Sequence, residues 1–175
     1  FPNKGIRMEP LYVTRIEDSY GNPIATFAPQ VYEVLPEEAA YKMLYMLRSV
    51  VDGGTAGRVR YGYGITAQMG GKTGTTQNNS DGWFMGFTPS LVAGCWVGGE
   101  DRSIHFDNMN EGQGAAMALP IYGLFMKKVY ADKKLGYSQK ETFEVPAEYS
   151  NPCHGYQPSG DYSSSSSSGI DDLFE

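Results

Sequence analysis

The chain has 175 residues and a net charge of −6, with 41% hydrophobic and 19% charged residues. This length and composition suit one globular domain with a hydrophobic core. The acidic balance and the lack of a basic run argue against nucleic-acid binding, and no apolar stretch is long enough to span a membrane. Residues 1–4 lead directly into domain-like sequence without a signal peptide, so we expect further residues upstream.

The first 52 residues predict a β-hairpin followed by a helix. Strand-forming residues at 11–16 and 24–27 flank a polar turn that contains Gly-Asn-Pro. Residues 36–52 begin with a proline and two glutamates, which suit the N-terminus of a helix. The apolar residues of this segment recur at helical spacing and predict one buried face: Ala40, Leu44, Leu47 and Val51.

The middle of the chain predicts a small antiparallel sheet. Residues 53–65 are rich in glycine, tyrosine and arginine without periodicity, which indicates a loop. Threonine-rich residues 66–76 and the apolar runs 83–88 and 91–97 predict three strands separated by short turns. Because successive strands usually pair with each other, a meander is the simplest topology.

A second helix is predicted over residues 113–130, with Pro120 marking a kink or a restart. Its predicted buried face consists of Ala118, Ile121, Phe125 and Val129. The fold class is therefore α+β: an antiparallel sheet with the 36–52 and 113–130 helices packed on it.

The composition changes near residue 150. Residues 163–168 are an unbroken serine run that cannot contribute to a core, so we expect residues 150–175 to be a disordered tail or tether after a domain spanning 1–149. The closing residues 170–175 are interpreted as a polar end with a few hydrophobic residues rather than a docking motif.

The cysteines and histidines predict no metal site and no cofactor. Cys95 lies in an apolar strand pattern and Cys153 in a loop beside His154, which favours one buried and one loop thiol but leaves a disulfide open. A Cys-His metal site lacks further ligands nearby in sequence. His105 follows a charged turn and is interpreted as a surface residue, and Asp81 as a residue that orders the turn before Trp83.

The segment around Lys72 carries the clearest chemical signal. Gly71-Lys72-Thr73 suggests a phosphate-binding loop, but the glycine that this motif needs at position 66 is a threonine. The residues that follow predict a turn and a strand, whereas a phosphate loop leads into a helix. Nucleotide binding is therefore disfavoured.

A Lys-Thr-Gly-Thr strand beside a cleft suits acyl-transfer chemistry. Side chains alternate along a strand, so Lys72 and Gly74 point to one side while Thr73 and Thr75 point to the other. Gly74 lets a substrate backbone lie close, threonine hydroxyls can bind a carboxylate, and lysine supplies positive charge or a proton path. A backbone N–H nearby can stabilise an oxyanion.

The flanking sequence resembles class A penicillin-binding proteins. The resemblance is most specific in the run Gly71-Lys72-Thr73-Gly74-Thr75-Thr76-Gln77-Asn78-Asn79 and the run from Asp81 to Pro89, and it extends over about residues 3–130. Supporting matches are Ile16-Glu17-Asp18 with Gly21-Asn22, Gly54-Thr55-Ala56, Trp96-Val97-Gly98, and Ala118 with Pro120-Ile121. The fold implied is part of a β-lactamase/transpeptidase-like domain, specifically its C-terminal part.

The resemblance implies a serine D,D-transpeptidase that cross-links peptidoglycan stem peptides and is acylated by β-lactams. The implied location is the periplasm or cell envelope, with the parent protein held in the inner membrane by an N-terminal anchor that this chain lacks. The implied site combines three motifs: Ser-x-x-Lys, Ser-x-Asn and Lys-Thr-Gly.

The resemblance also implies roles for individual residues. Lys72 would stabilise substrate and assist proton transfer, and Thr73 and Thr75 would bind the carboxylate of the stem peptide or antibiotic. The Thr75 backbone N–H would form half of the oxyanion hole, beside Gly74. Trp83 would line the cleft, although a core aromatic of the sheet is an equally good interpretation.

The chain departs from the family pattern in one respect. No lysine has a serine three positions before it, and no Ser-x-Asn is present. We therefore expect this chain alone to be inactive and to need the upstream half of the same domain. The alternatives are a non-catalytic module of the same ancestry that binds peptidoglycan or a partner, and an unrelated β-rich binding domain in which Lys-Thr-Gly-Thr is accidental.

Overall fold

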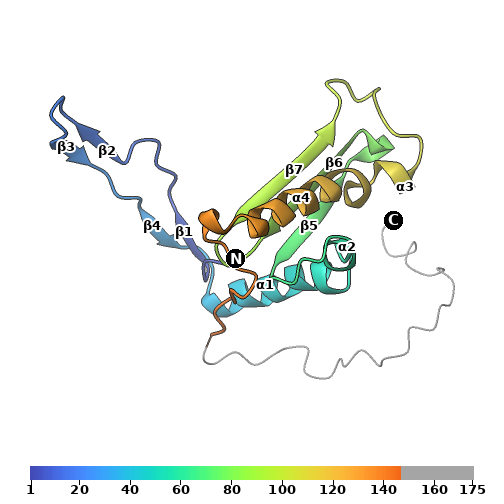
Figure 1. Ribbon diagram of the computed structural model, residues 1–175, viewed down its shortest axis with the longest axis horizontal. Helices are drawn as coiled ribbons and strands as arrows, with labels where there is room; N and C mark the ends of the chain where they lie inside the picture. The colour runs from blue at the N-terminus through green and yellow to red at the C-terminus, as the bar shows by residue number, and fades with distance from the viewer. Residues whose placement is uncertain (147–175) are drawn as a thin grey trace.

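The computed structural model describes residues 1–146, and the predicted tail 150–175 lies outside them. The described residues form an N-terminal arm of paired strands and a body in which a three-stranded sheet packs against helices (Figure 1). Mixed helices and antiparallel strands confirm the predicted α+β class.

The predicted hairpin is present in the arm. Strand β2 (Arg15–Glu17) pairs antiparallel with β3 (Pro23–Thr26). The Asp18 carboxylate accepts hydrogen bonds from the backbone N–H groups of Tyr20 and Asn22, both at 2.8 Å, and Gly21 takes a φ of +85° that suits glycine. Turn chemistry therefore fixes this hairpin locally.

The arm is longer than the sequence predicted. Strand β1 (Ile6–Met8) pairs antiparallel with β4 (Val31–Glu33), so a second pair of strands extends the hairpin toward the body. These three-residue strands carry too little alternation to be recognised in the sequence. Figure 1 shows the arm projecting from the body, and several of its apolar side chains are largely exposed: Tyr12, Tyr20, Ile24 and Val31.

Helix α1 (Glu37–Asp52) confirms the first predicted helix, and it lies along β5. Its buried residues are Ala40, Tyr41, Leu44 and Val51. The prediction of a loop over 53–65 is wrong in part, because a single-turn helix, α2 (Arg58–Tyr61), forms there and buries Val59. One turn is too short to show helical periodicity.

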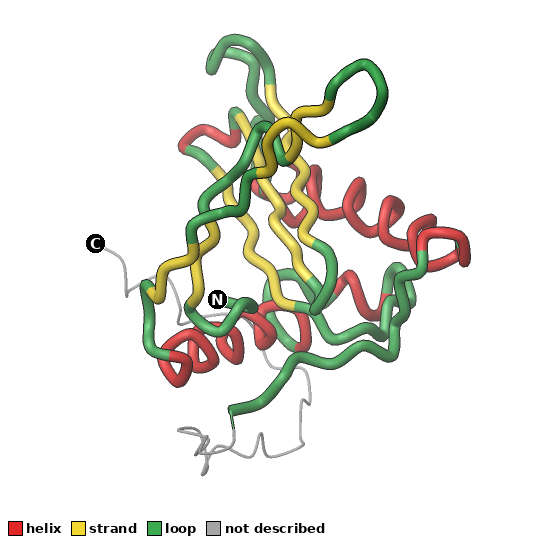
Figure 2. The backbone as a smooth tube through the Cα atoms, turned by 90° about the vertical axis from the view of Figure 1, so that its left-hand side faces the viewer, coloured by secondary structure: helices red, strands yellow, loops and turns green. Residues whose placement is uncertain are grey.

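The predicted meander is confirmed. Strands β5 (Gly70–Thr75), β6 (Asp81–Phe87) and β7 (Val92–Gly98) form an antiparallel sheet in the order β5-β6-β7. Figure 2 shows the strands of this sheet in yellow, side by side. A short 3₁₀ turn at Gln77–Asn79 joins β5 to β6. The first strand starts four residues later than predicted, at Gly70.

The last predicted helix is present as α4 (Gly114–Ala131), preceded by a single-turn helix, α3 (Met109–Gly112), and followed by the 3₁₀ turn Lys133–Leu135. Of the two alternatives predicted at Pro120, a kink or a restart, the restart is wrong, because α4 runs through this residue. The break lies instead at Gln113, whose backbone is extended.

The buried face of α4 differs from the prediction. Ile121 and Phe125 are 50% and 46% exposed, while Ala118 and Val129 are buried as expected. The residues that fill the core in their place are Leu119, Tyr122 and Met126. Because α4 is apolar almost all round, its sequence does not determine which face turns inward.

One face of the sheet forms the main core, and the other is open. Phe84 of β6 packs with buried residues from all three neighbouring helices: Val51, Val59, Ala118, Leu119, Tyr122 and Met126. On the opposite face, four apolar side chains are 43–63% exposed: Trp83, Met85, Val92 and Trp96. At one end of that face, Phe87 packs with Tyr41, Leu44 and Phe143.

Candidate functional site

Lys72 and Gly74 lie on the open face of the sheet. The pairing of β5 with β6 sets Lys72 opposite Met85 and Gly74 opposite Trp83, so these residues share one face. Trp83 in turn is paired with Trp96, and their ring centroids are 6.5 Å apart. The lysine therefore lies beside an exposed apolar surface.

The Lys72 side chain is exposed and its ammonium group is accessible to a ligand. Its ammonium donates to the backbone carbonyl of Thr73 at 2.9 Å, and within residues 1–146 it has no ion pair. Within residues 1–146, strand β5 is an edge strand that pairs with β6 on one side only. An edge strand offers backbone groups that an extended peptide can pair with.

Thr73 and Thr75 lie on the other face of β5. The Thr73 and Thr55 hydroxyls are 3.3 Å apart, and the Thr75 hydroxyl oxygen accepts a hydrogen bond from the Gly114 N–H at 3.0 Å. This contact leaves the Thr75 hydroxyl proton available for an acceptor. Four of the five predicted site residues are thus divided between the two faces of the edge strand β5, and Trp83 lies on the neighbouring strand β6.

The contacts of Thr55 with Thr73 and of Gly114 with Thr75 were not predicted from the sequence. Thr55 lies in the Gly54-Thr55-Ala56 segment, which carried only a supporting resemblance. Gly114 follows Gly112 with one residue between them, directly before an apolar helix. Paired glycines at the start of a helix are a signal of close backbone approach that could have identified this contact.

Gly114 brings the start of α4 directly against the sheet. A Cβ atom at this position would lie 2.4 Å from the Gly74 carbonyl oxygen and 2.5 Å from that of Trp83. We expect Gly114→Ala to lower the free energy of unfolding by about 3 kcal/mol or more, because backbone atoms cannot move aside cheaply. Urea denaturation measures this change.

The matched control for Gly114 is Gly53→Ala, since a Cβ at position 53 meets no atom within 4 Å. We expect this variant to unfold within about 0.5 kcal/mol of the original chain. Equal stability of the two variants would contradict the close approach of α4 to β5.

Arg60 anchors the chain that leads into β5. Its guanidinium donates to the carbonyl oxygens of Ile65 and Ala67 at 2.9 and 2.6 Å, and to one Asp52 carboxylate oxygen at 3.1 and 2.6 Å. The side chain is 24% exposed, so water replaces these contacts poorly. Arg60 therefore links the end of α1 to the segment that precedes Lys72.

We expect Arg60→Ala to lower the free energy of unfolding by about 2–3 kcal/mol, because two backbone carbonyls lose a charged donor. Arg60→Lys should recover only part of this loss, since an ammonium cannot reproduce the planar guanidinium contacts. Hydrogen exchange of residues 65–75 should accelerate in both variants. The nearby exposed Arg58, changed to alanine, is the control, and an equal effect there would contradict the anchoring role.

The turn after β5 is held by side chains. The Asp81 N–H donates to the Thr76 hydroxyl at 3.1 Å, and this hydroxyl lies 3.0 Å from the Asp81 carboxylate. The prediction that Asp81 orders the turn before Trp83 is confirmed. His105 is exposed, as predicted.

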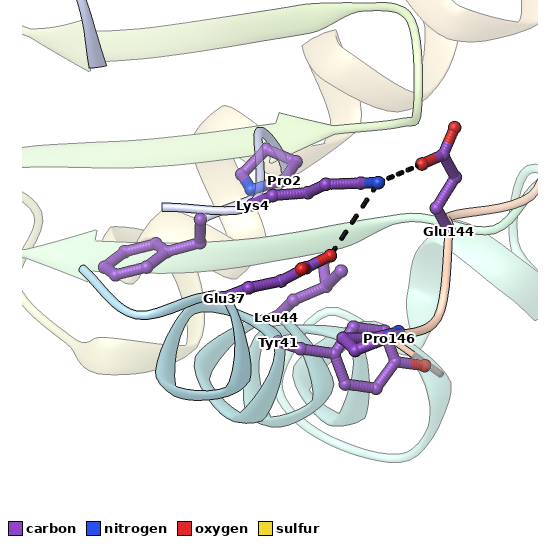
Figure 3. A pocket seen from close by; sticks show the side chains of 8 residues that line it. Pro2, Lys4, Glu37, Tyr41, Leu44, Glu144 and Pro146 are labelled. Atoms are coloured by element: carbon purple, nitrogen blue, oxygen red, sulfur yellow. Dashed lines mark ion pairs between the residues drawn. The ribbon is translucent and has the colours of Figure 1, made fainter. Parts of the chain in front are cut away.

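A small cavity at the base of the arm holds about 10 Å³, which is room for one water molecule (Figure 3). Lys4 pairs there with Glu37 of α1, at 3.7 Å, and with Glu144. The hydrogen bond and charge of Lys4 lower the pKa of Glu144, and Glu144 raises that of Lys4. These exposed groups join the arm to α1 and the 144 segment but form no reactive cluster.

Among the described residues, no three His, Cys, Asp or Glu side chains come together as metal ligands would. The helices within residues 1–146 are all too short or too polar to cross a bilayer. Burial raises the pKa of the Cys95 thiol on β7, which disfavours the reactive thiolate.

The described residues form an α+β body with the Lys-Thr-Gly-Thr motif on the edge strand β5. The family model of the penicillin binding protein transpeptidase domain matches residues 1–97. Penicillin-binding protein 1A of Aquifex aeolicus is 36% identical over 148 residues, covering 85% of this chain and 19% of that protein. Penicillin-binding protein 1B of Haemophilus influenzae is 30% identical over 131 residues, covering 75% of this chain and 16% of that protein.

Solved structures agree on the fold. Penicillin-binding protein 1A from Haemophilus influenzae matches with a TM-score of 0.63 and 24% identity, covering 75% of this chain and 25% of that one. The D,D-transpeptidase domain of a peptidoglycan glycosyltransferase from Eggerthella lenta matches with a TM-score of 0.52 and 22% identity. This match covers 74% of this chain and 29% of that one.

The chain therefore belongs to the penicillin-binding protein transpeptidase domain family and corresponds to the C-terminal part of that domain in class A penicillin-binding proteins. It spans about a fifth of the length of the curated relatives named here, which are bacterial proteins. Family membership excludes the alternative of an unrelated β-rich domain.

Proposed function

We propose that this chain supplies the Lys-Thr-Gly-Thr wall of a serine D,D-transpeptidase site in the bacterial cell envelope. The substrates would be peptidoglycan stem peptides, and β-lactams would acylate the same site. The observation that carries the proposal is the exposed Lys72 on the edge strand β5, which has no ion pair within residues 1–146. The periplasmic location and the membrane anchor of the parent protein are part of this proposal.

Each residue of the wall has a proposed role. Lys72 would stabilise substrate and move a proton through the serine of a Ser-x-Asn motif, as a positioned general acid–base group does. Thr73 and Thr75 would bind the terminal carboxylate, and the Thr75 N–H would contribute to the oxyanion hole. Gly74 would allow close approach of the peptide, with Trp83 beside it.

The nucleophile would come from another part of the domain. This chain contains no Ser-x-x-Lys and no Ser-x-Asn. The open sheet face beside Lys72, with Trp83 and Met85 exposed, supports a covering segment from the upstream half of the domain. We place the domain's C-terminal part at residues 1–149, with residues 150–175 as a tail.

The open face predicts the behaviour of the isolated chain. Because exposed apolar strands associate, we expect this chain to self-associate in light scattering. Changing Met85 and Trp96 together to lysine should increase the monomer fraction several-fold, whereas Tyr61→Lys, at an exposed site on α2, should not. A well-folded monomer with a cooperative melt would contradict this expectation.

A chimera tests the function. Residues 1–146 would replace the matching stretch of the Aquifex aeolicus relative, and we expect the remainder of that protein to supply the family's Ser-x-x-Lys and Ser-x-Asn motifs. We expect a fluorescent penicillin to label the chimera and not the isolated chain. A folded chimera without label would instead favour a non-catalytic module that binds peptidoglycan or a partner.

A further inference from the structure

A second cavity lies at the end of the sheet near the start of α4. It holds about 350 Å³, within the range of small-molecule pockets. Its walls come from the end of β7, the loop that follows, and α4, with Val97, Ile104, Phe106 and Met117 as apolar side chains. Ile104 and Phe106 are 60% and 41% exposed, so an apolar occupant would cover surface that the described residues leave open.

The loop that forms the outer wall is held in place by hydrogen bonds. The Phe106 N–H donates to the Asn79 carbonyl oxygen at 3.3 Å, and the Asn79 side-chain amide donates to the Phe106 carbonyl at 3.4 Å. Farther along, the Ile104 N–H donates to the Asp101 carbonyl at 3.0 Å. The cavity is thus preformed, which reduces the cost of ordering it on binding.

His105 gives the cavity a directional polar group. Its Nδ1 lies 3.2 Å from the Phe106 carbonyl oxygen, which can only accept a hydrogen bond. In the neutral ring Nδ1 must therefore carry the proton, and Nε2 is an acceptor. Ser80, the other polar side chain of the lining, is 6% exposed and already bonded to Thr76 at 2.9 Å.

We propose that this cavity binds a small apolar ring that carries one hydrogen-bond donor, with the donor directed to Nε2 of His105. The occupant would also contact elements that hold the β5 motif. Met117 lies one turn after Gly114, whose N–H donates a hydrogen bond to the Thr75 hydroxyl. Ser80 is hydrogen-bonded to Thr76, which directly follows Thr75 in the sequence. This binding does not depend on the proposed transpeptidase function.

Calorimetry with two matched probes tests the proposal on the full chain. Indole offers an apolar ring with an N–H donor, and benzofuran has the same shape without the donor. We expect indole to bind about 5–10-fold more tightly than benzofuran, because a lost hydrogen bond to the site costs about that factor. Equal affinities, or no measurable binding of indole, would overturn the proposal.

Variants locate the binding. His105→Phe should bring the two probes to equal affinity, and Ile104→Trp should weaken both more than tenfold by filling the cavity. Tyr61→Ser, on α2 away from the lining, should change neither. Hydrogen exchange with indole should slow in residues 97–117, and protection confined to the Trp83 and Trp96 strand face would show binding elsewhere and overturn the proposal.

Discussion

Replacing Lys72 by alanine in the chimera is expected to lower the second-order rate constant of penicillin acylation by about 10²–10⁴-fold. A positioned acid–base group contributes rate factors of this size. Lys72 is the one cationic residue of strand β5 (Gly70–Thr75). Stopped-flow or time-resolved labelling with a fluorescent penicillin measures the rate constant.

Two controls accompany this variant. Lys127→Ala removes an exposed lysine from α4 and should leave acylation unchanged within a factor of about two. Both chimeras should melt at similar temperatures, since Lys72 has no ion pair within residues 1–146. A Lys72→Ala chimera that is acylated at the original rate would remove this residue from the proposed mechanism.

Tyr122→Ala is expected to lower the free energy of unfolding by about 3–5 kcal/mol, the cost of removing a large buried aromatic side chain. Tyr122 is 0% exposed, and its ring packs edge-to-face on Phe84 with centroids 4.8 Å apart. Its ring occupies the space beside Gly86, where an added Cβ would lie 2.4 Å from Tyr122 Cζ. Its hydroxyl has no hydrogen-bond partner among the described residues. Burial also raises the pKa of this phenol, so it remains neutral.

Tyr122→Phe should therefore behave in the opposite way to the alanine variant. It keeps the ring and removes an unsatisfied buried hydroxyl, so we expect unchanged stability or a gain of about 1 kcal/mol in urea denaturation. Tyr61→Ala, at a side chain that is 84% exposed, should shift stability by less than about 0.5 kcal/mol. A Tyr122→Phe loss as large as that of Tyr122→Ala would contradict this packing.

The regular elements were predictable because their sequence signals are local. The 36–52 helix has its acidic start and its apolar stripe within one segment, and the three-strand meander has a threonine-rich run and two apolar runs between short turns. Turn chemistry at Asp18 and Gly21 likewise fixes the hairpin without help from the rest of the chain.

The inward face of α4 depended on information outside the helix. Gly86 leaves space on β6 that the Tyr122 ring fills, and Gly82 leaves space for Met117. An apolar helix turns toward the surface that offers such space, and its own periodicity does not reveal where that space lies. The prediction of Ile121 and Phe125 as core residues was wrong for this reason.

The sequence predicted which side chains of β5 share a face, but not which residues of other elements they contact. Alternation correctly separated Lys72 and Gly74 from Thr73 and Thr75. The partners of the two threonines, Thr55 and Gly114, lie 18 and 39 residues away in sequence, and only the fold brings them together. The assigned roles of these residues remain predictions for the chimera to test.

The central claim is that this chain forms one wall of a site whose nucleophile lies elsewhere in the domain. Peptide mapping by mass spectrometry of the penicillin-treated chimera tests it most directly. We predict a single penicilloyl adduct on the serine of the Ser-x-x-Lys motif supplied by the relative, and none on residues 1–146. An adduct on a serine of this chain, such as Ser80 or Ser90, would contradict the account.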